Sequence, residues 1–127
     1  MITIKLGELE SILKCFSSIV VQKISISLAY RIGKLVKRLQ EEFVAYDELR
    51  QRLCKEHCTK DKNDQPMIKD DKYVGLDHNP DFRQAILDLQ ALSVEVDFEP
   101  IPISLLEKDN VLISSIEASV LDQFIKE

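Results

Sequence analysis

The stretch that decides the fold is Ile26–His57, ISLAYRIGKLVKRLQEEFVAYDELRQRLCKEH. Apolar residues recur in it at steps of three or four, at positions 28, 32, 35, 39, 43, 46, 49 and 53. No proline interrupts the stretch, and its only glycine is Gly33. This period is that of an amphipathic α-helix, so we predict one unbroken helix over 26–57.

A helix of this length is long for a chain of 127 residues. It would span about 48 Å, whereas a compact domain of this size has a radius of gyration of about 14 Å. The helix must therefore project from the body or be covered along its length by other helices. Its apolar stripe is explained either as intramolecular core or, in part, as a seam for a partner or a second copy.

Before the long helix, the sequence predicts a strand and a helix. Met1–Leu6 alternates apolar and polar residues, which is typical of a strand. A helix from about Glu8 has apolar residues at 9, 12, 13 and 16 on one face and is expected to end at Ser17-Ser18. Residues 19–27 are interpreted as a connection that leads into the long helix, with Ser25 or Ser27 as its cap, although 24–27 also alternates like a strand.

Residues 59–78 form a polar stretch too long for a structureless connection in a compact domain. The turn-forming pair Asp70-Asp71 lies between Lys69 and Lys72, and short apolar pairs at 67–68 and 73–74 flank this run. We predict a small β-hairpin closed by Gly75. A mobile segment is the alternative.

The C-terminal third predicts a helix, a strand and a final helix. Asn79-Pro80-Asp81 combines a cap, a proline and an acidic first turn, so we predict a helix over 79–92 with residues 82, 86, 89 and 92 on its inner face. Residues 94–98, VEVDF, alternate like a strand. Ser104–Glu107 and Ser114–Glu117 each match the capping box, and the second leads a helix over 115–125 with residues 116, 120, 121 and 124 inward.

The strands at 1–6 and 94–98 have no other evident partner, so we pair them with each other. The chain is then a single domain over residues 1–127 of the α+β class, predominantly helical. One long central helix is packed by shorter helices, and a small two-stranded antiparallel sheet and a β-hairpin insertion complete the fold.

Composition narrows the classes of function. Apolar residues make up 45% of the chain and charged residues 31%, which is an ordinary globular balance, and the net charge of -5 argues against a general nucleic-acid binder. The start of the chain lacks the pattern of a signal peptide, and no apolar run approaches the roughly 20 residues of a membrane span. Three cysteines do not form a disulfide framework. We therefore expect a cytoplasmic protein with no membrane association.

One group of residues resembles a metal site. Cys54, His57, Cys58 and His78 offer four nitrogen and sulfur ligands for tetrahedral zinc. Their spacing matches no standard zinc motif, and a histidine near a helix C-terminus is favoured without any metal. We therefore expect no metal at these residues and no cofactor elsewhere.

Catalytic motifs are missing as well. The sequence has no phosphate-binding glycine loop, nucleophile elbow or dinucleotide fingerprint. Its adjacent carboxylates, such as Glu41-Glu42, lie in charged runs, where nothing separates their pKa values. We therefore expect that the protein is not an enzyme.

The first half of the long helix carries a basic patch that includes Arg31, Lys34 and Arg38. The patch could meet phosphate or an acidic partner. Alternatively, it is a solvated face balanced by the acidic residues at 41, 42 and 48, and no interleaved aromatic residues are present for base stacking.

The run Leu28–Phe43, LAYRIGKLVKRLQEEF, resembles a known kind of sequence, as do the elements after it. These are Leu49–Leu53, the charged turn at 60–64, the hairpin at 67–73, the strand at 94–98 and the stretch Ile101–Ser104. Their order is similar to small bacteriophage and prophage proteins of unknown function that share a long Ala-Tyr-Arg-type helix. The resemblance implies a phage-encoded accessory protein in the bacterial host cell and carries over no catalytic residue.

We therefore expect a non-enzymatic accessory protein that acts by protein–protein interaction, in virion assembly or by inhibiting a host or defence protein. The candidate partner-binding residues are Arg31, Lys34 and Arg38 on the long helix and Lys69, Asp70, Asp71, Lys72 and Tyr73 at the hairpin. The alternative function is nucleic-acid or nucleotide binding by the basic patch. A homo-oligomer is also compatible with the long apolar stripe.

Overall fold

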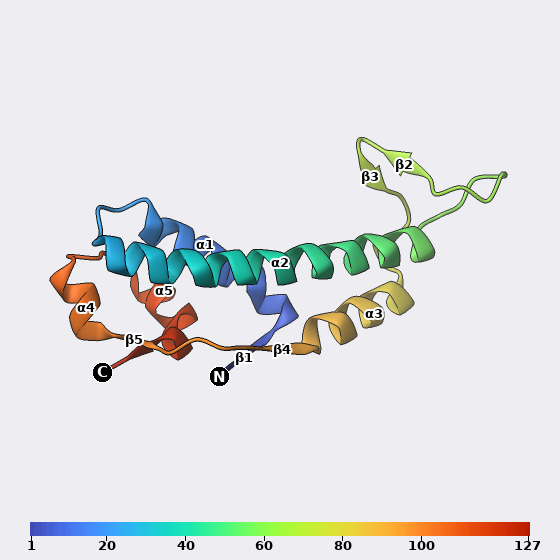
Figure 1. Cartoon of the computed structure of the whole chain (residues 1–127). Helices are drawn as coiled ribbons and strands as arrows, with labels where there is room; N and C mark the ends of the chain where they lie inside the picture. The colour runs from blue at the N-terminus through green and yellow to red at the C-terminus, as the bar shows by residue number, and fades with distance from the viewer.

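A computed structural model describes all 127 residues and places them around one rod, α2 (Ile26–His57) (Figure 1). These bounds are the predicted ones. Ser25 is the N-cap, because its hydroxyl accepts a hydrogen bond from the Leu28 N–H at 3.3 Å. The 32 residues run without a break, which confirms the predicted helix.

The chain begins with β1 (Ile2–Lys5), a 3-10 turn η1 (Leu6–Glu8) and α1 (Leu9–Val20). The predicted end of the first helix at Ser17-Ser18 is wrong. The Ser17 hydroxyl donates to the Leu13 carbonyl at 2.9 Å, so this serine is satisfied inside the helix, and burial of Ile19 carries the helix on to Val20. The alternative strand at 24–27 is also wrong, because residues 26 and 27 belong to α2.

The predicted pairing of the two distant strands is confirmed. β4 (Ser93–Val96) lies antiparallel to β1, with Ile2 opposite Val96 and Ile4 opposite Val94. The strand ends at Val96, whereas the sequence predicted that it would reach Phe98. One face of this two-stranded sheet packs on the core, since Ile2, Ile4 and Val96 are buried.

The hairpin is formed by β2 (Ile68–Lys69) and β3 (Lys72–Tyr73), as predicted. Asp70 and Asp71 both have positive φ, 52° and 62°, which is the requirement of the tight turn that matches strand twist. Gly75 closes the base of the hairpin at φ 86°, where an added Cβ would lie 2.0 Å from the Thr59 hydroxyl oxygen. Figure 1 shows the hairpin standing off to one side of the C-terminal end of α2, while the loop that leads into β2 reaches past that end.

Helix α3 (Pro80–Ala91) returns along the distal half of α2. Asn79 caps α3 by accepting from the Phe82 N–H at 3.0 Å, and its amide donates to the His57 carbonyl at 3.1 Å, which ties the start of α3 to the end of α2. Leu89 is buried as predicted. The predicted inward position of Leu92 is wrong, because Leu92 is the exposed residue that ends the helix.

The C-terminal segment forms β5 (Ile101–Pro102), α4 (Ile103–Lys108), α5 (Ser115–Val120), a 3-10 turn η2 (Asp122–Phe124) and β6 (Ile125–Lys126), with β6 parallel to β5. The predicted capping box at Ser104 is wrong, since Ser104 lies inside α4, whose N-cap is Pro102. The box at Ser114–Glu117 is confirmed. The final helix is shorter than predicted and leaves Ile116 exposed, while Leu121 and Phe124 are buried.

The hydrophobic core lies against the first part of α2. Leu28, Ile32, Leu35, Leu39 and Tyr46 are the buried residues of this helix, and none is buried after Tyr46. α1, the β1–β4 sheet and the C-terminal segment cover the proximal part, whereas α3 alone among the helices packs on the distal part. The predicted apolar stripe is therefore core at one end of the rod and half-exposed at the other. None of the helices has the length and apolar character needed to cross a bilayer.

The capping box predicts an acid dependence of stability. The Ser114 N–H donates to Glu117 at 3.0 Å, and this bond, followed by one from the Ser18 side chain, holds the pKa of Glu117 below its ordinary value. A lowered folded pKa stabilises the protein above the unfolded pKa, and this contribution disappears as the pH falls through the folded pKa.

We therefore expect wild-type stability in urea to fall more steeply than that of Glu117→Gln as the pH drops below about 4.3, the ordinary carboxylate pKa of glutamate. Glu41→Gln, at an exposed glutamate, is the matched control and should follow the wild type. Identical pH profiles for wild type and Glu117→Gln would contradict the prediction.

Candidate functional site

A surface groove of about 480 Å³ lies between α2 and the stretch Val96–Glu99. Its helical wall is formed by Tyr30, Arg31, Lys34, Leu35 and Arg38, and its other wall by Val96, Asp97, Phe98 and Glu99. The groove thus brings together the three basic residues that the sequence singled out on the long helix. This volume is within the range of ligand pockets.

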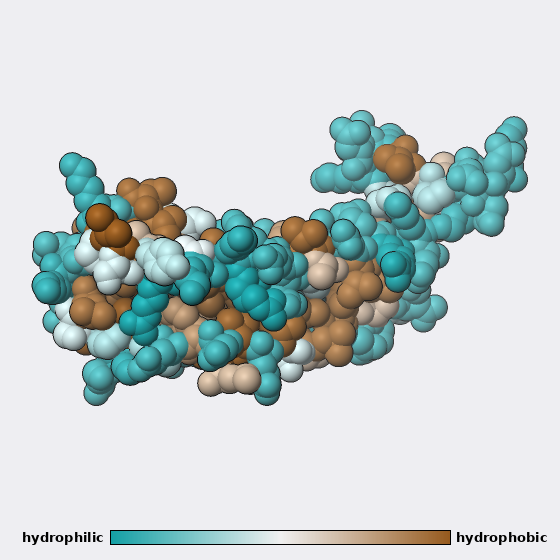
Figure 2. All heavy atoms as spheres, viewed as in Figure 1, coloured by the Kyte–Doolittle hydropathy of each residue, from teal (hydrophilic) through white to brown (hydrophobic).

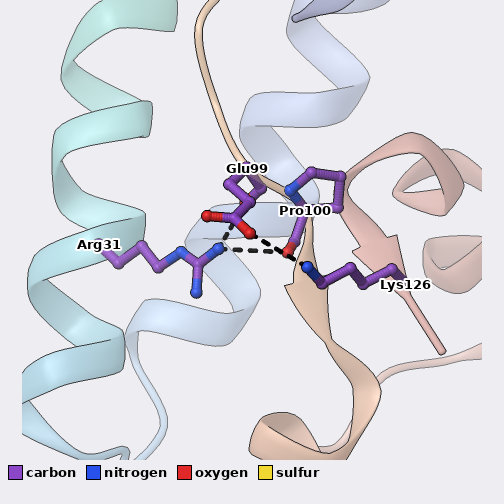
Figure 3. Close-up of polar contacts among 4 residues, drawn as sticks. All are labelled: Arg31, Glu99, Pro100 and Lys126. Carbon is purple, nitrogen blue, oxygen red and sulfur yellow. Dashed lines mark hydrogen bonds and ion pairs between the residues drawn. The ribbon is translucent and has the colours of Figure 1, made fainter.

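Arg31 connects the two walls (Figure 3). Its guanidinium donates to the carbonyl oxygen of Glu99 at 2.6 Å and to that of Pro100 at 3.2 Å, and it lies 5.5 Å from the centre of the Phe98 ring. On the other side of this stretch, the Lys126 ammonium pairs with the Glu99 carboxylate at 3.2 Å. Arg31 therefore closes one end of the groove and positions its non-helical wall.

Lys34 and Arg38 are the more available cations of the groove. Lys34 lies 5.5 Å from the Tyr30 ring centre and takes part in no ion pair. Arg38 forms an ion pair with Glu42, one turn along the same helix. Such an exposed pair contributes little to stability, so the arginine is free to exchange its partner.

The chemistry of the groove suits binding. It has no histidine, cysteine, serine or threonine, and its charged groups are three cations on the helix and two carboxylates on the opposite wall. Between them, the half-buried Phe98 offers apolar surface, while Leu35 and Val96 line the groove as buried core residues. The arrangement offers electrostatic and apolar recognition of a ligand.

Beside the groove, exposed apolar residues gather at the end of the molecule where α1 turns into α2. Ile26 is 89% exposed, Leu112 79% and Ile116 77%, and Val20, Val21 and Leu105 are also exposed. We call these six residues the apolar end. Figure 2 shows hydrophobic spheres at this end, opposite the hydrophilic hairpin arm. Tyr30, itself exposed, connects the apolar end to the groove.

Hydrogen bonds hold the segments of the apolar end together. The Gln22 amide donates to the Leu112 carbonyl at 2.8 Å and accepts from the Leu112 N–H at 2.9 Å. The Asp109 carboxylate accepts from the Ser25 hydroxyl at 2.8 Å and from the Ser25 N–H at 3.1 Å. The surface is therefore built on a fixed backbone, although its residues come from three separate stretches of the chain.

The second set of predicted partner-binding residues lies elsewhere. Lys69, Asp70, Asp71 and Lys72 are exposed and Tyr73 is half-buried in the hairpin. Figure 1 places the hairpin beside the C-terminal end of α2, away from the groove and the apolar end, which lie toward the other end of the helix. The structure thus brings Arg31, Lys34 and Arg38 together in one site and leaves the hairpin residues as a separate surface.

The structure does not bring the four metal-like residues together: no group of three or more His, Cys, Asp or Glu side chains is arranged to hold an ion. The His57 ring packs 6.0 Å from that of Phe82, and the Cys58 sulfur lies 3.4 Å from the Lys55 carbonyl oxygen. Burial, more than the nearby charges, raises the pKa of Cys54. His78 lies in the turn before α3 with φ 65°.

Sequence reasoning missed several residues of the site. Asp97 and Phe98 were assigned only to a strand, and Leu112 lies in a stretch with no periodic signal. The apolar run Ile19–Val21 was visible in the sequence and was the one available sign of the apolar end. The pairing of Gln22 with Leu112 spans 90 residues and leaves no local signature.

Comparisons with protein-family models, curated proteins and solved structures gave no match. The resemblance to small phage proteins therefore stays a prediction.

Proposed function

We propose that this chain is a non-enzymatic protein that acts by binding another protein, through the apolar end and the adjoining groove. The observation that carries the proposal is the position of the exposed apolar residues. Apart from Met1, the five most exposed large apolar side chains are Val21, Ile26, Tyr30, Leu112 and Ile116, and all belong to the apolar end or join it to the groove. Clusters of exposed apolar residues are typical of interaction surfaces.

The construction of the apolar end supports this proposal. A rigid surface loses less conformational entropy when a partner docks on it, and the apolar end is held by the Gln22–Leu112 and Ser25–Asp109 hydrogen bonds. Apolar residues next to a polar rim are the usual anatomy of a protein interface. Lys34 and Arg38 provide such a rim on the side of the groove.

For the biological role we propose a phage-type accessory protein in a bacterial host cell, working in virion assembly or inhibiting a host or defence protein. This part of the proposal rests on the resemblance of Leu28–Phe43 and the elements after it. The position of the gene discriminates between the two roles. Neighbouring capsid and tail genes would indicate assembly, whereas early-expressed neighbours would indicate host inhibition.

The alternative of nucleic-acid binding receives less support from the basic patch. Arg31 donates its hydrogen bonds to the Glu99 and Pro100 carbonyls, which leaves Lys34 and Arg38 as the two available cations of the groove. Asp97 and Glu99 add negative charge to the facing wall. A phosphate backbone requires several free cations on one surface, so a protein partner suits this surface better.

Photocrosslinking in the native cells tests the proposed function. A photoreactive amino acid at position 26 or 112 is expected to give discrete crosslinked products. The same group at Leu87, an exposed leucine on α3, is the matched control and should give none. A product of twice the mass of the chain would identify the partner as a second copy, to be checked by light scattering at two concentrations. Equal products from all three positions would contradict a specific surface at the apolar end.

A further inference from the structure

We propose that the groove takes an extended acidic segment of the partner, which adds as a third strand to the outer edge of β4. This inference rests on the proposed function and specifies the form in which a partner occupies the groove. Three observations carry it: the unpaired edge of β4, the position of that edge beside the groove, and the charge of the helical wall.

The outer edge of β4 is unpaired. β4 pairs with β1 alone, in a register that sets Val94 opposite Ile4 and Val96 opposite Ile2, and the Leu6 N–H donates to the Leu92 carbonyl. In an antiparallel pair, the two strands exchange backbone hydrogen bonds at every second residue. The backbone N–H and C=O groups of the even-numbered residues of β4 therefore point toward β1. Ser93 and Glu95 therefore turn their backbone groups outward. No backbone hydrogen bond outside the helices and ladders involves residues 93–98.

This edge continues into the groove. The stretch Val96–Glu99 begins at the last residue of β4 and forms the wall that faces α2. Figure 3 shows it passing between α2 and the segment that carries Lys126. Four extended residues span about 13 Å, which sets the length over which an added strand would pair. An unpaired strand edge binds an extended chain through main-chain hydrogen bonds.

The helical wall determines the charge of the occupant. Lys34 has no ion-pair partner, and Arg38 is paired only with Glu42 of its own helix. A carboxylate on the incoming segment would pair with Lys34 across the groove, while an apolar side chain would contact the half-buried ring of Phe98. Asp97 lies on the wall opposite α2 and would repel an acidic side chain of the incoming segment. The acidic side chain must therefore point toward α2.

A library of random ten-residue peptides, displayed and selected against the full-length protein, tests the inference. We expect the selected peptides to be acidic and free of central proline. In synthetic copies, methylating alternate backbone amides should weaken binding at least tenfold by fluorescence anisotropy, because those N–H groups pair with β4. Methylating the amides between them should have little effect.

Charge reversal on the helix provides the matched pair of variants. Lys34→Glu is expected to raise the Kd of the acidic peptides at least tenfold. Lys37→Glu, an exposed lysine outside the groove, should leave the Kd within twofold of wild type. Both substitutions are at the surface, so both variants are expected to fold.

The outcomes separate the inference from the proposed function. If no peptide is selected, or binding is insensitive to backbone methylation, strand addition is wrong. Peptides that lose affinity with Ile26→Ser but keep it with Lys34→Glu would contradict strand addition and support docking on the apolar end. If acidic peptides bind as described but positions 26 and 112 give no crosslinks, strand addition in the groove is supported. Partner binding at the apolar end is then wrong.

Discussion

Replacement of Phe124 by alanine is expected to lower the free energy of unfolding by about 3–5 kcal/mol, the usual cost of removing a buried phenylalanine. Phe124 is fully buried near the end of the chain, with its ring 5.2 Å from that of Phe16 on α1 and 6.0 Å from that of Phe98. It therefore joins the C-terminal segment both to the core and to the wall of the groove. Urea denaturation followed by circular dichroism measures the change.

The control for Phe124→Ala is Ile116→Ala in the preceding helix. Ile116 is an exposed apolar residue, so its truncation should change stability by no more than about 0.5 kcal/mol. A similar loss of stability in both variants would show that the C-terminal segment does not pack as described. Because Phe98 lines the groove and packs on Phe124, Phe124→Ala is also expected to weaken the binding of any ligand in the groove.

Leu39→Ala is expected to destabilise the protein by about 2–5 kcal/mol, and Leu53→Ala by less than half as much. The two leucines lie on the same stripe of α2. Leu39 is fully buried in the main core, whereas Leu53 is partly buried, beyond the last buried residue of the helix. The cost of truncation depends on how much buried apolar surface is removed and how large a cavity remains. Both quantities are smaller where α3 is the one covering helix.

Thermal and urea unfolding of the two variants measures this difference. Equal destabilisation would mean that the distal part of the rod is covered as thoroughly as the proximal part. The docking proposal does not depend on the distal part, because the most exposed apolar residues lie at the opposite end of α2. This position differs from the sequence-based expectation, which looked for surplus apolar surface along the stripe itself.

Local patterns in the sequence were sufficient where one short segment determines its own conformation. The unbroken period predicted α2 to the residue, Asn79-Pro80 predicted the start of α3, and Asp70-Asp71 predicted the hairpin turn. The same kind of reasoning placed Arg31, Lys34 and Arg38 on one flank of the helix, where they form a wall of the groove. Their roles differ, because Arg31 contacts the opposite wall and Lys34 does not.

Local patterns failed where a segment could satisfy two arrangements. Ser17 and Ser104 resemble helix boundaries in sequence, but both lie inside helices. Ile116 has the spacing of a core residue, but α5 ends at Val120 before its predicted face is complete. In each case, packing against distant segments overrides a weak local preference.

By itself, the sequence determined a long amphipathic rod, the caps and turns around it, and a pair of strands with no other partner. Only the tertiary structure decided which part of the rod is covered, that Val96–Glu99 lies across from the basic flank, and that Leu112 joins Val21 and Ile26 at one end. The physical reason is the distance along the chain over which each interaction acts. Helix period, capping and turn geometry act over a few residues, whereas a groove and an exposed apolar surface depend on contacts between segments up to 90 residues apart.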